Sequence, residues 1–411
     1  MLTGPDRAGQ VRIASARPPR LLGVIWALLL LDTLGYTAVD LIIPFPRQLA
    51  QVITMAALGL AFGLAVTLNP RGLVRPNAYL LLVSLLTIVA LASSLLLTAG
   101  LGALLRCARL VLFVATLWLT TAWWRGDLYV ARLHLRTVCV VLLTVLAGLV
   151  ISPGSAFSGP NGRLVGAIWP IQPPQVGMYA ATAIGLAVLL RLTRNIDWRS
   201  TVVITVPATV LLLLSHTRTA LLGLLVALGV AGLTLALTYG RVRRAIGTAA
   251  ALAVVGAGLF SESIMVWLQR GQDAEELANL TGRQKVWDLL LGADRSLGEE
   301  IMGVGLTDKS FAGLPIDNTW LAVYHEQGLL GVGLVAAIMV GLLAIAALRP
   351  PSAQRACAVF LVGYCIIASY TEVTLGDASP YVLNLAVAAA LLVAPGPAAV
   401  APGGLSRKAL G

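Results

Sequence analysis

The chain has 411 residues, of which 58% are hydrophobic and only 11% are charged, and its mean hydropathy is +0.88. This composition excludes an ordinary soluble domain and predicts a polytopic membrane protein, because most of the chain must be solvated by lipid. The formal net charge of +11 does not point to nucleic acid, since membrane proteins gather cations on their cytoplasmic loops. We therefore expect membrane lipids as partners and no nucleic acid.

Residues 1–20 are basic and rich in proline, and no cleavage signature of a signal peptide precedes the first apolar run. We interpret them as a disordered cytoplasmic tail. Twelve apolar runs follow, each about long enough to cross a bilayer as a helix. They cover residues 21–43, 49–68, 78–99, 101–123, 133–151, 174–191, 200–215, 219–239, 245–260, 328–348, 354–371 and 379–395. The predicted fold class is therefore all-α, with spans one to nine in 21–260, spans ten to twelve in 317–395, and a second cytoplasmic tail at 396–411.

The cations indicate that both termini lie in the cytoplasm. Nineteen of the 29 lysines and arginines fall in the tails and loops that this orientation makes cytoplasmic, as the positive-inside rule requires. The other ten lie outside or at the outer membrane boundary, namely Arg47, Arg106, Arg109, Arg163, Arg218, Arg270, Arg283, Lys285, Arg295 and Lys309. These ten run against the bias, so they need a functional explanation more than the rest.

The one long loop, residues 261–316, is predicted to lie on the outer side between spans nine and ten. Its apolar residues recur at helical steps of three and four, at Ile264, Trp267, Leu268, Leu277, Trp287, Leu290 and Leu291. Tryptophan favours the membrane interface, so we expect one or two amphipathic helices at the outer membrane surface. No separate soluble domain is expected.

Three arginines of the outer side stand where an apolar span meets a loop. Arg163 follows the turn-rich stretch PGSAFSGPNG, Arg218 precedes the apolar run ALLGLLVALGVAGL, and Arg283 precedes Lys285 in the long loop. A guanidinium binds phosphate oxygens through two donors and is never deprotonated, so the three together suggest a lipid-linked phosphate or diphosphate ligand. The alternative is that boundary arginines extend to lipid headgroups or to water.

The start of span ten carries further candidates, in the segment PIDNTWLAVYHEQGLLGVGL. At helical spacing one face carries Asp317, Trp320, Leu321, Tyr324 and Gly328, which would place a carboxylate above two aromatic rings, an arrangement that could hold a sugar. Capping of the helix is the alternative role for Asp317. We expect His325 and Glu326 to be a buried pair in helix packing, and Glu372 and Asp377 are further acidic candidates without informative spacing.

Neither the outer loops nor the long loop contains a D-x-D pair, a histidine cluster or a glycine-rich phosphate loop. The usual sequence features of a divalent-metal or nucleotide site are therefore missing. We expect no cofactor and no metal, with protein cations carrying any phosphate chemistry instead.

The chain resembles the O-antigen ligase and polymerase superfamily over residues 160–335. The resemblance rests on GRLVGAIWPIQPPQVGMY, on SHTRTALLGLLVAL, and on the run from TGRQKVWDLLL through EEIMGVGLTD to DNTWLAVYHEQGLLGVG, and the span count and long outer loop agree with it. The ligase motif is a His, a restricted residue, nine free positions and Gly-x-x-Gly. Asn318, Gly328 and Gly331 meet this spacing, but Asp317 stands where the ligase has His. This departure leaves a polymerase or another glycan ligase open beside a lipopolysaccharide ligase.

The resemblance implies a glycosyltransferase of the bacterial inner membrane with its site facing outwards. The donor would be a glycan on a polyprenyl diphosphate, undecaprenyl diphosphate in the family, and the acceptor would be a hydroxyl of a glycan or lipid that attacks with inversion. We expect Asp317 to be the base and Arg218 and Arg283 to bind the diphosphate. We further expect substrate binding by Arg163, Lys285, Asn318, Trp320 and Tyr324. A flippase for the same carrier, or a transporter, is the alternative.

Overall fold

The computed structural model describes residues 19–34, 41–96, 100–158, 162–269, 283–307 and 309–394. The helices in these ranges are α2 (Leu21–Asp32), α3 (Arg47–Leu68), α4 (Ala78–Leu96), α5 (Leu101–Thr120), the short η1 (Thr121–Trp123), α6 (Tyr129–Ile151), α7 (Pro173–Leu192), α8 (Trp198–Leu214), α9 (Arg218–Ala236), α10 (Gly240–Leu259), α11 (Ser261–Gln269), α13 (Arg283–Leu291), α14 (Leu297–Met302), α15 (Thr319–Leu348), α16 (Ala353–Ala368) and α17 (Pro380–Leu391). Two hairpins pair β1 (Phe157–Ser158) with β2 (Arg163–Leu164) and β3 (Ser310–Phe311) with β4 (Leu314–Pro315).

Eight helices in the described ranges are long and apolar enough to cross a membrane. They are α3, α4, α5 extended by η1, α6, α7, α9, α10 and α15. Four shorter apolar helices, α2, α8, α16 and α17, coincide with the remaining predicted spans. The all-α prediction is thus confirmed, and the apolar helices are compatible with a multi-pass membrane protein, while the count of twelve spans stays a prediction.

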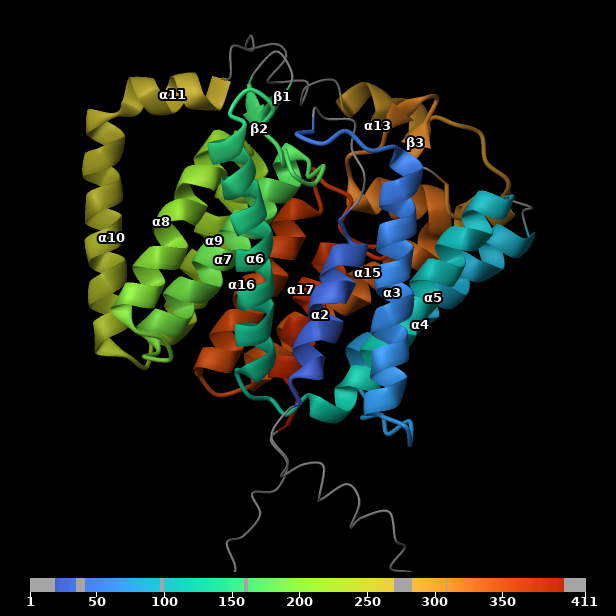
Figure 1. The fold of residues 1–411 in the computed structure, drawn as a ribbon, viewed down its shortest axis with the longest axis horizontal. Helices are drawn as coiled ribbons and strands as arrows, with labels where there is room; N and C mark the ends of the chain where they lie inside the picture. Colours follow the sequence, from blue (N-terminus) through green and yellow to red (C-terminus); the bar gives the residue numbers. More distant parts are fainter. Residues whose placement is uncertain are drawn as a thin grey trace, which may run out of the picture.

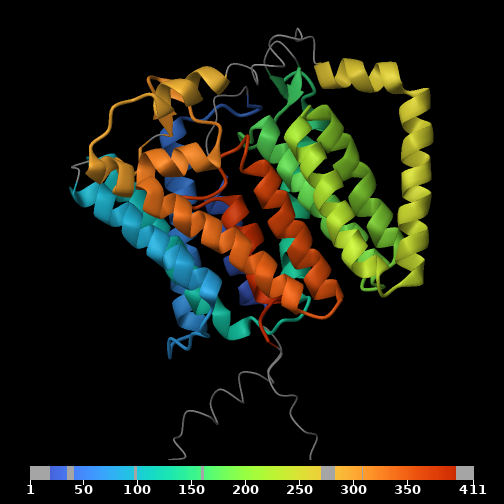
Figure 2. The ribbon, with the colours of Figure 1, turned by 180° about the vertical axis from the view of Figure 1, so that it is seen from behind.

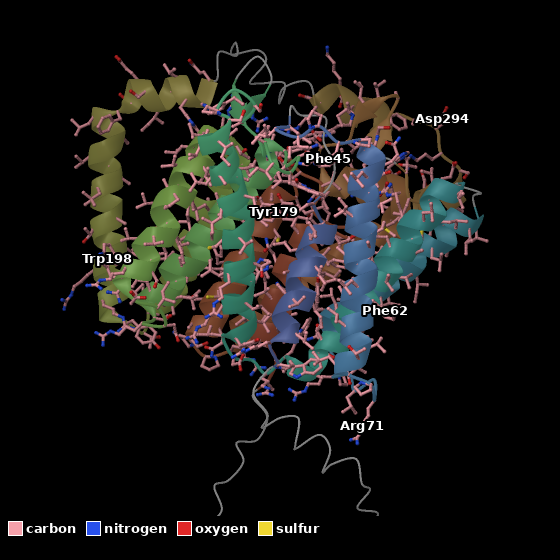
Figure 3. All side chains as sticks on the ribbon, in the orientation of Figure 1. Phe45, Phe62, Arg71, Tyr179, Trp198 and Asp294 are labelled. Carbon is pink, nitrogen blue, oxygen red and sulfur yellow. The ribbon has the colours of Figure 1, made fainter. Side chains whose placement is uncertain are left out.

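The helices run between two ends of the molecule (Figure 1). One end carries α11, α13 and both hairpins, and we call it the outer end, following the predicted orientation. Arg71 lies at the opposite end, and Asp294 lies at the outer end (Figure 3). We call the end at Arg71 the inner end.

Helix α7 is the most deeply buried of the eight candidate spans, since its neighbours α6, α8, α9 and α16 surround it. Helix α16 in turn packs against α9, α15 and α17. Figure 2 shows the orange and red helices α15, α16 and α17 crossing the middle of the molecule. The core that joins these helices runs through most of the bundle and positions the outer ends of α9, α15 and α16.

Helix α10 differs from the other candidate spans because it stands at the edge of the bundle (Figure 1). Only Val242 of this helix is buried. At its outer end the chain turns into α11, which lies across the outer end of the molecule. Within the predicted long loop the structure has the helices α11, α13 and the short α14, whereas Leu277 lies outside the described residues. A position of these helices at the membrane surface stays a prediction.

Two predicted spans have different boundaries in the structure. The first run was expected to continue to residue 43, but α2 ends at Asp32, where the carboxylate accepts a hydrogen bond from Arg109. The tenth was expected from residue 328, but α15 begins at Thr319 because the side chain of Asn318 caps it. Polar partners inside the protein, rather than hydropathy, decide both boundaries.

Gly328 breaks α15 inside the bundle. Its backbone has φ 64° and ψ −164°, and an added Cβ would lie 2.3 Å from the carbonyl of Ile301, so the position requires glycine. The break frees carbonyls of the preceding turn, and the segment after α14 bonds to them: Val304 N–H donates to His325 O at 2.9 Å, and Gly305 N–H donates to Glu326 O at 3.0 Å. Irregular backbone within the bundle is thereby satisfied by protein.

Candidate active site

Arg163, Arg218 and Arg283 lie together at the outer end, and we call them the arginine cluster. They are the first residues of β2, α9 and α13 respectively. Burial lowers the pKa of Arg163, and the charges of Arg283 and Arg218 lower it further, whereas Glu372 opposes this effect. Residues that are distant in the sequence therefore form one cationic site.

Backbone and hydroxyl groups at the turn between α8 and α9 hold Arg163. Its Nε donates to Ser215 O at 3.1 Å, and one terminal nitrogen donates to Thr217 Oγ1 at 3.3 Å. The turn can pack this closely on α7 because residue 177 is glycine, whose added Cβ would lie 2.8 Å from Thr217 Cβ. The orientation of Arg163 is thus set by the packing of three helices.

Arg218 contacts the end of α11. A terminal nitrogen of Arg218 donates to Gln269 O at 3.2 Å. Trp267 fixes the same helix by donating from Nε1 to Leu213 O at 3.1 Å, and its ring stacks on His216 with centroids 5.7 Å apart. The amphipathic helix therefore docks on the turn that presents Arg218.

Arg283 forms an ion pair with Asp317. Its Nε lies 3.3 Å from Asp317 Oδ2, and the two side chains are 26% and 44% exposed. Asp317 is not the cap of α15, since Asn318 accepts a hydrogen bond from Leu321 N–H at 3.0 Å. The capping alternative for Asp317 is therefore wrong, and the carboxylate faces the arginine cluster.

Glu372 lies in the loop between α16 and α17 and is half-buried. Burial raises the pKa of its carboxyl from 4.5 to about 7, although Arg283 and Arg163 lower it and Asp317 raises it further. A carboxyl with a pKa near neutrality is well matched to proton transfer at neutral pH. The site thus holds two carboxyls, of which Asp317 is paired with an arginine and Glu372 is desolvated.

Hydrogen bonds from α15 hold the loop at residues 369–379. Asn318 Nδ2 donates to Tyr370 O at 3.0 Å, and Gln327 Nε2 donates to Gly376 O at 2.8 Å. Between them the buried Thr319 donates from Oγ1 to Glu372 O at 2.6 Å and accepts from Thr374 N–H at 2.7 Å. The backbone of Glu372 is therefore held in place by its hydrogen bond from Thr319.

A second charged group lies farther from the outer end, where Arg106 of α5 meets two buried carboxylates. Arg106 lies 2.7 Å from Asp377 Oδ2 and 3.3 Å from Glu326 Oε1, and Lys309 Nζ lies 3.8 Å from Asp377. Glu326 Oε1 also accepts from Thr307 N–H at 2.8 Å. We call Arg106, Lys309, Glu326 and Asp377 the Arg106 cluster.

The residues of the expected sugar-binding face of α15 also have contacts within the protein. Asn318 uses both ends of its amide within the protein, and Trp320 donates from Nε1 to Ser369 Oγ at 3.1 Å. Tyr324 packs in a separate cluster beneath α13, and the guanidinium of Arg295 lies over its ring at 4.6 Å. These contacts give Asn318 a structural role, and Lys285 is exposed. Sugar binding by Trp320 and Tyr324 stays a prediction.

His325 and Glu326 are both buried, as expected, but they have different partners. His325 Nδ1 lies 3.1 Å from a terminal nitrogen of Arg295, whereas Glu326 belongs to the Arg106 cluster. The sequence offered Glu372 only as a further acidic candidate, and it gave Arg106 no specific role. Arginine within an apolar run was the available signal for Arg106, because a charge at that depth needs a partner. No spacing could reveal Glu372, since its neighbours come from other elements.

Comparison of the sequence with protein-family models and with curated proteins finds no match. Within the described ranges, no group of three or more His, Cys, Asp or Glu side chains has an arrangement suited to a metal ion.

Proposed function

We propose that the protein transfers a glycan from a polyprenyl-diphosphate carrier to an acceptor hydroxyl at the outer face of a bacterial inner membrane. The observation that carries this proposal is the arginine cluster around Glu372 and Asp317, at the boundary between apolar helices and the outer segments. A lipid diphosphate has the matching chemistry, an apolar chain and a compact anion. The resemblance in the motifs around Arg163, Arg218 and Arg283 supports the same donor.

In this proposal the three arginines stabilise the leaving group. When the bond between the anomeric carbon and the diphosphate oxygen breaks, its electron pair goes to the diphosphate, which gains negative charge. Fixed guanidinium donors lower the energy of that charge without a metal ion. Arg163 and Arg218 are already oriented by Ser215 and Gln269, so little reorganisation is required.

The sequence predicts Asp317 as the base, but we assign the base to Glu372 instead. The acceptor oxygen forms the new bond to the anomeric carbon, and its proton goes to the carboxylate of Glu372. What favours Glu372 is its pKa of about 7, because a carboxylate with a raised pKa binds a proton readily at neutral pH. Asp317 orients Arg283 through their ion pair.

The test is transfer by the purified protein from a polyprenyl-diphosphate-linked oligosaccharide. We expect a new glycosidic product and free polyprenyl diphosphate, both lost in Glu372→Gln. Intact donor after incubation with a range of glycan and lipid acceptors would reject the proposal, and movement of that intact donor between bilayer leaflets would indicate the flippase alternative.

A further inference from the structure

The Arg106 cluster is costly to build. Arg106 and Lys309 are about a quarter exposed, at 25% and 24%, whereas Glu326 and Asp377 are only 2% and 8% exposed. Charges withdrawn from water inside a bundle of apolar helices are retained mainly where they serve a function. Nothing in the transfer chemistry proposed above uses these four side chains.

The Arg106 cluster bonds both to the loop that carries Glu372 and to α15, which holds this loop. Asp377 belongs to the loop itself, five residues after Glu372, and receives two hydrogen bonds from Arg106, at 3.2 Å from Nε and at 2.7 Å from a terminal nitrogen. Burial opposes ionisation, but Lys309, Arg106 and Arg109 lower the pKa of Asp377 to about 2. Asp377 therefore stays charged and bound to Arg106 throughout the neutral range.

The same guanidinium also bonds to Glu326, two residues before the break in α15. Its remaining terminal nitrogen lies 3.3 Å from Glu326 Oε1, and Glu326 precedes Gln327, which holds Gly376 of the loop. Thr307 N–H and Oγ1 complete the contacts of that carboxylate oxygen, at 2.8 Å and 3.2 Å. One side chain of α5 thus connects the loop, the broken helix and the segment after α14.

We propose that Arg106 is a positioning residue, which fixes the loop at residues 369–379 against α15 so that Glu372 faces the arginine cluster. This inference rests on the proposed function, because it explains how the base is placed. The hydrogen bonds of Arg106 go to Asp377 and Glu326 and not to the arginine cluster.

Arg109 provides a matched control. It lies one turn further along α5, is 23% exposed, and pairs with the fully buried Asp32 of α2 at 2.9 Å. The pair resembles that of Arg106 in depth, exposure and chemistry, but it bonds to α2 and not to the loop. Loss of Arg109 removes a buried ion pair while the hydrogen bonds of the loop remain.

A crosslink reports the position of the loop without any enzyme assay. Thr371, next to Glu372, has its Oγ1 2.6 Å from Thr219 Oγ1 of α9. Cysteines in the variant Thr219→Cys with Thr371→Cys should therefore form a disulfide on oxidation in the membrane. The four native cysteines are free and three of them are buried, so they compete little.

We expect Arg106→Gln to lose most of this crosslink and Arg109→Gln to keep it. In the protein with native threonines, Arg106→Gln should lower kcat by about a hundredfold with little change in the KM for the donor. The acid limb of its pH profile should move to lower pH, because a displaced Glu372 regains water. Arg109→Gln should keep the acid limb of the wild-type pH profile even if the variant unfolds more easily. Arg106→Lys should recover part of the crosslink and part of kcat.

A folded Arg106→Gln variant with wild-type crosslinking would overturn the inference. Should that variant not accumulate, the neutral pair Arg106→Gln with Asp377→Asn removes the uncompensated buried charge. It should also lose the crosslink, and full crosslinking there would equally reject the role. If the crosslink depends on Arg106 but the wild type transfers no glycan, the positioning role stands and the proposed function fails.

Discussion

At the residue scale, the arginine cluster depends on the shape of the guanidinium as well as on its charge. Arg163 and Arg218 each keep a fixed orientation through backbone carbonyls, so their remaining donors point in set directions. A lysine at either position supplies a charge on a flexible stem and no planar pair of donors. A lysine variant therefore tests the geometry of the donors while the charge is kept.

We expect Arg218→Lys to lower the transfer rate by roughly tenfold to a thousandfold, on the order of 1.4–4 kcal/mol of transition-state stabilisation. Arg241→Lys is the control, because Arg241 belongs to the inner end, where it donates to Leu192 O at 2.9 Å. Initial rates with saturating donor measure both variants. Equal rates in Arg218→Lys and wild type would mean that Arg218 only contacts headgroups or the chain.

The two carboxyls of the site should differ in their pH dependence. Glu372 has a pKa of about 7, so it is protonated below that pH and cannot accept the acceptor's proton. The wild-type rate should therefore fall as the pH decreases below about 7, and Glu372→Gln should lose about a hundredfold to ten-thousandfold in rate. Asp317→Asn should weaken donor binding through Arg283 and keep the acid limb. A limb near pH 4 in the wild type would assign the base to a carboxyl of ordinary pKa.

The raised pKa of Glu372 also affects the stability of the fold. Because folding raises the pKa of Glu372 from 4.5 to about 7, the fold loses stability as the pH rises through this interval. Glu372→Gln removes that loss, so at pH 8 its Tm should equal or exceed that of the wild type. A lower Tm would show that the variant loses activity through misfolding.

At the element scale, hydropathy predicted the helices well and their functional ends poorly. The apolar runs coincide with helices because a membrane span must bond its own backbone internally. The end of α2 at Asp32 and the start of α15 after Asn318 depend on Arg109 and on the loop at residues 369–379, which are distant in the sequence. Local hydropathy contains no information on such partners.

The candidate site, too, could be predicted from the sequence only in part. The three arginines could be recognised because they run against the charge bias at the ends of apolar runs. Glu372 was one of several acidic candidates and could not be preferred, because its pKa depends on burial and on charges from β2 and α13. Sugar binding by the face of α15 with Trp320 and Tyr324 stays a prediction, and the sequence did not show that Trp320 donates to Ser369 or that Tyr324 packs beneath α13.

The break in α15 leads to a prediction at this scale. Gly328→Ala forces a left-handed residue and places a Cβ 2.3 Å from the Ile301 carbonyl, so we expect a loss of unfolding free energy on the order of 1–3 kcal/mol or more. Gly333 lies in the same helix with no atom within 4 Å of an added Cβ, so Gly333→Ala is the control and should change little. Thermal unfolding in detergent measures both. Equal Tm values for the two variants would mean that α15 does not need its break.

At the scale of the whole molecule, the account requires that the arginine cluster face outwards. Asp294 and Arg71 lie at opposite ends and are both exposed (Figure 3). In intact cells whose outer membrane is permeabilised, Asp294→Cys should react with an impermeant thiol reagent, and Arg71→Cys should react only after lysis. The reverse labelling would place the site in the cytoplasm and remove the proposed donor.

The central claim is covalent, metal-independent glycan transfer, and one measurement tests it most directly. The purified protein in lipid vesicles is incubated with EDTA, a polyprenyl-diphosphate-linked oligosaccharide and a glycan acceptor, and the products are separated by mass. The account predicts a glycosidic product and free polyprenyl diphosphate in equal amounts, at a rate that the chelator leaves unchanged. Loss of all activity in EDTA and its recovery with magnesium or manganese would contradict stabilisation of the leaving group by arginines alone.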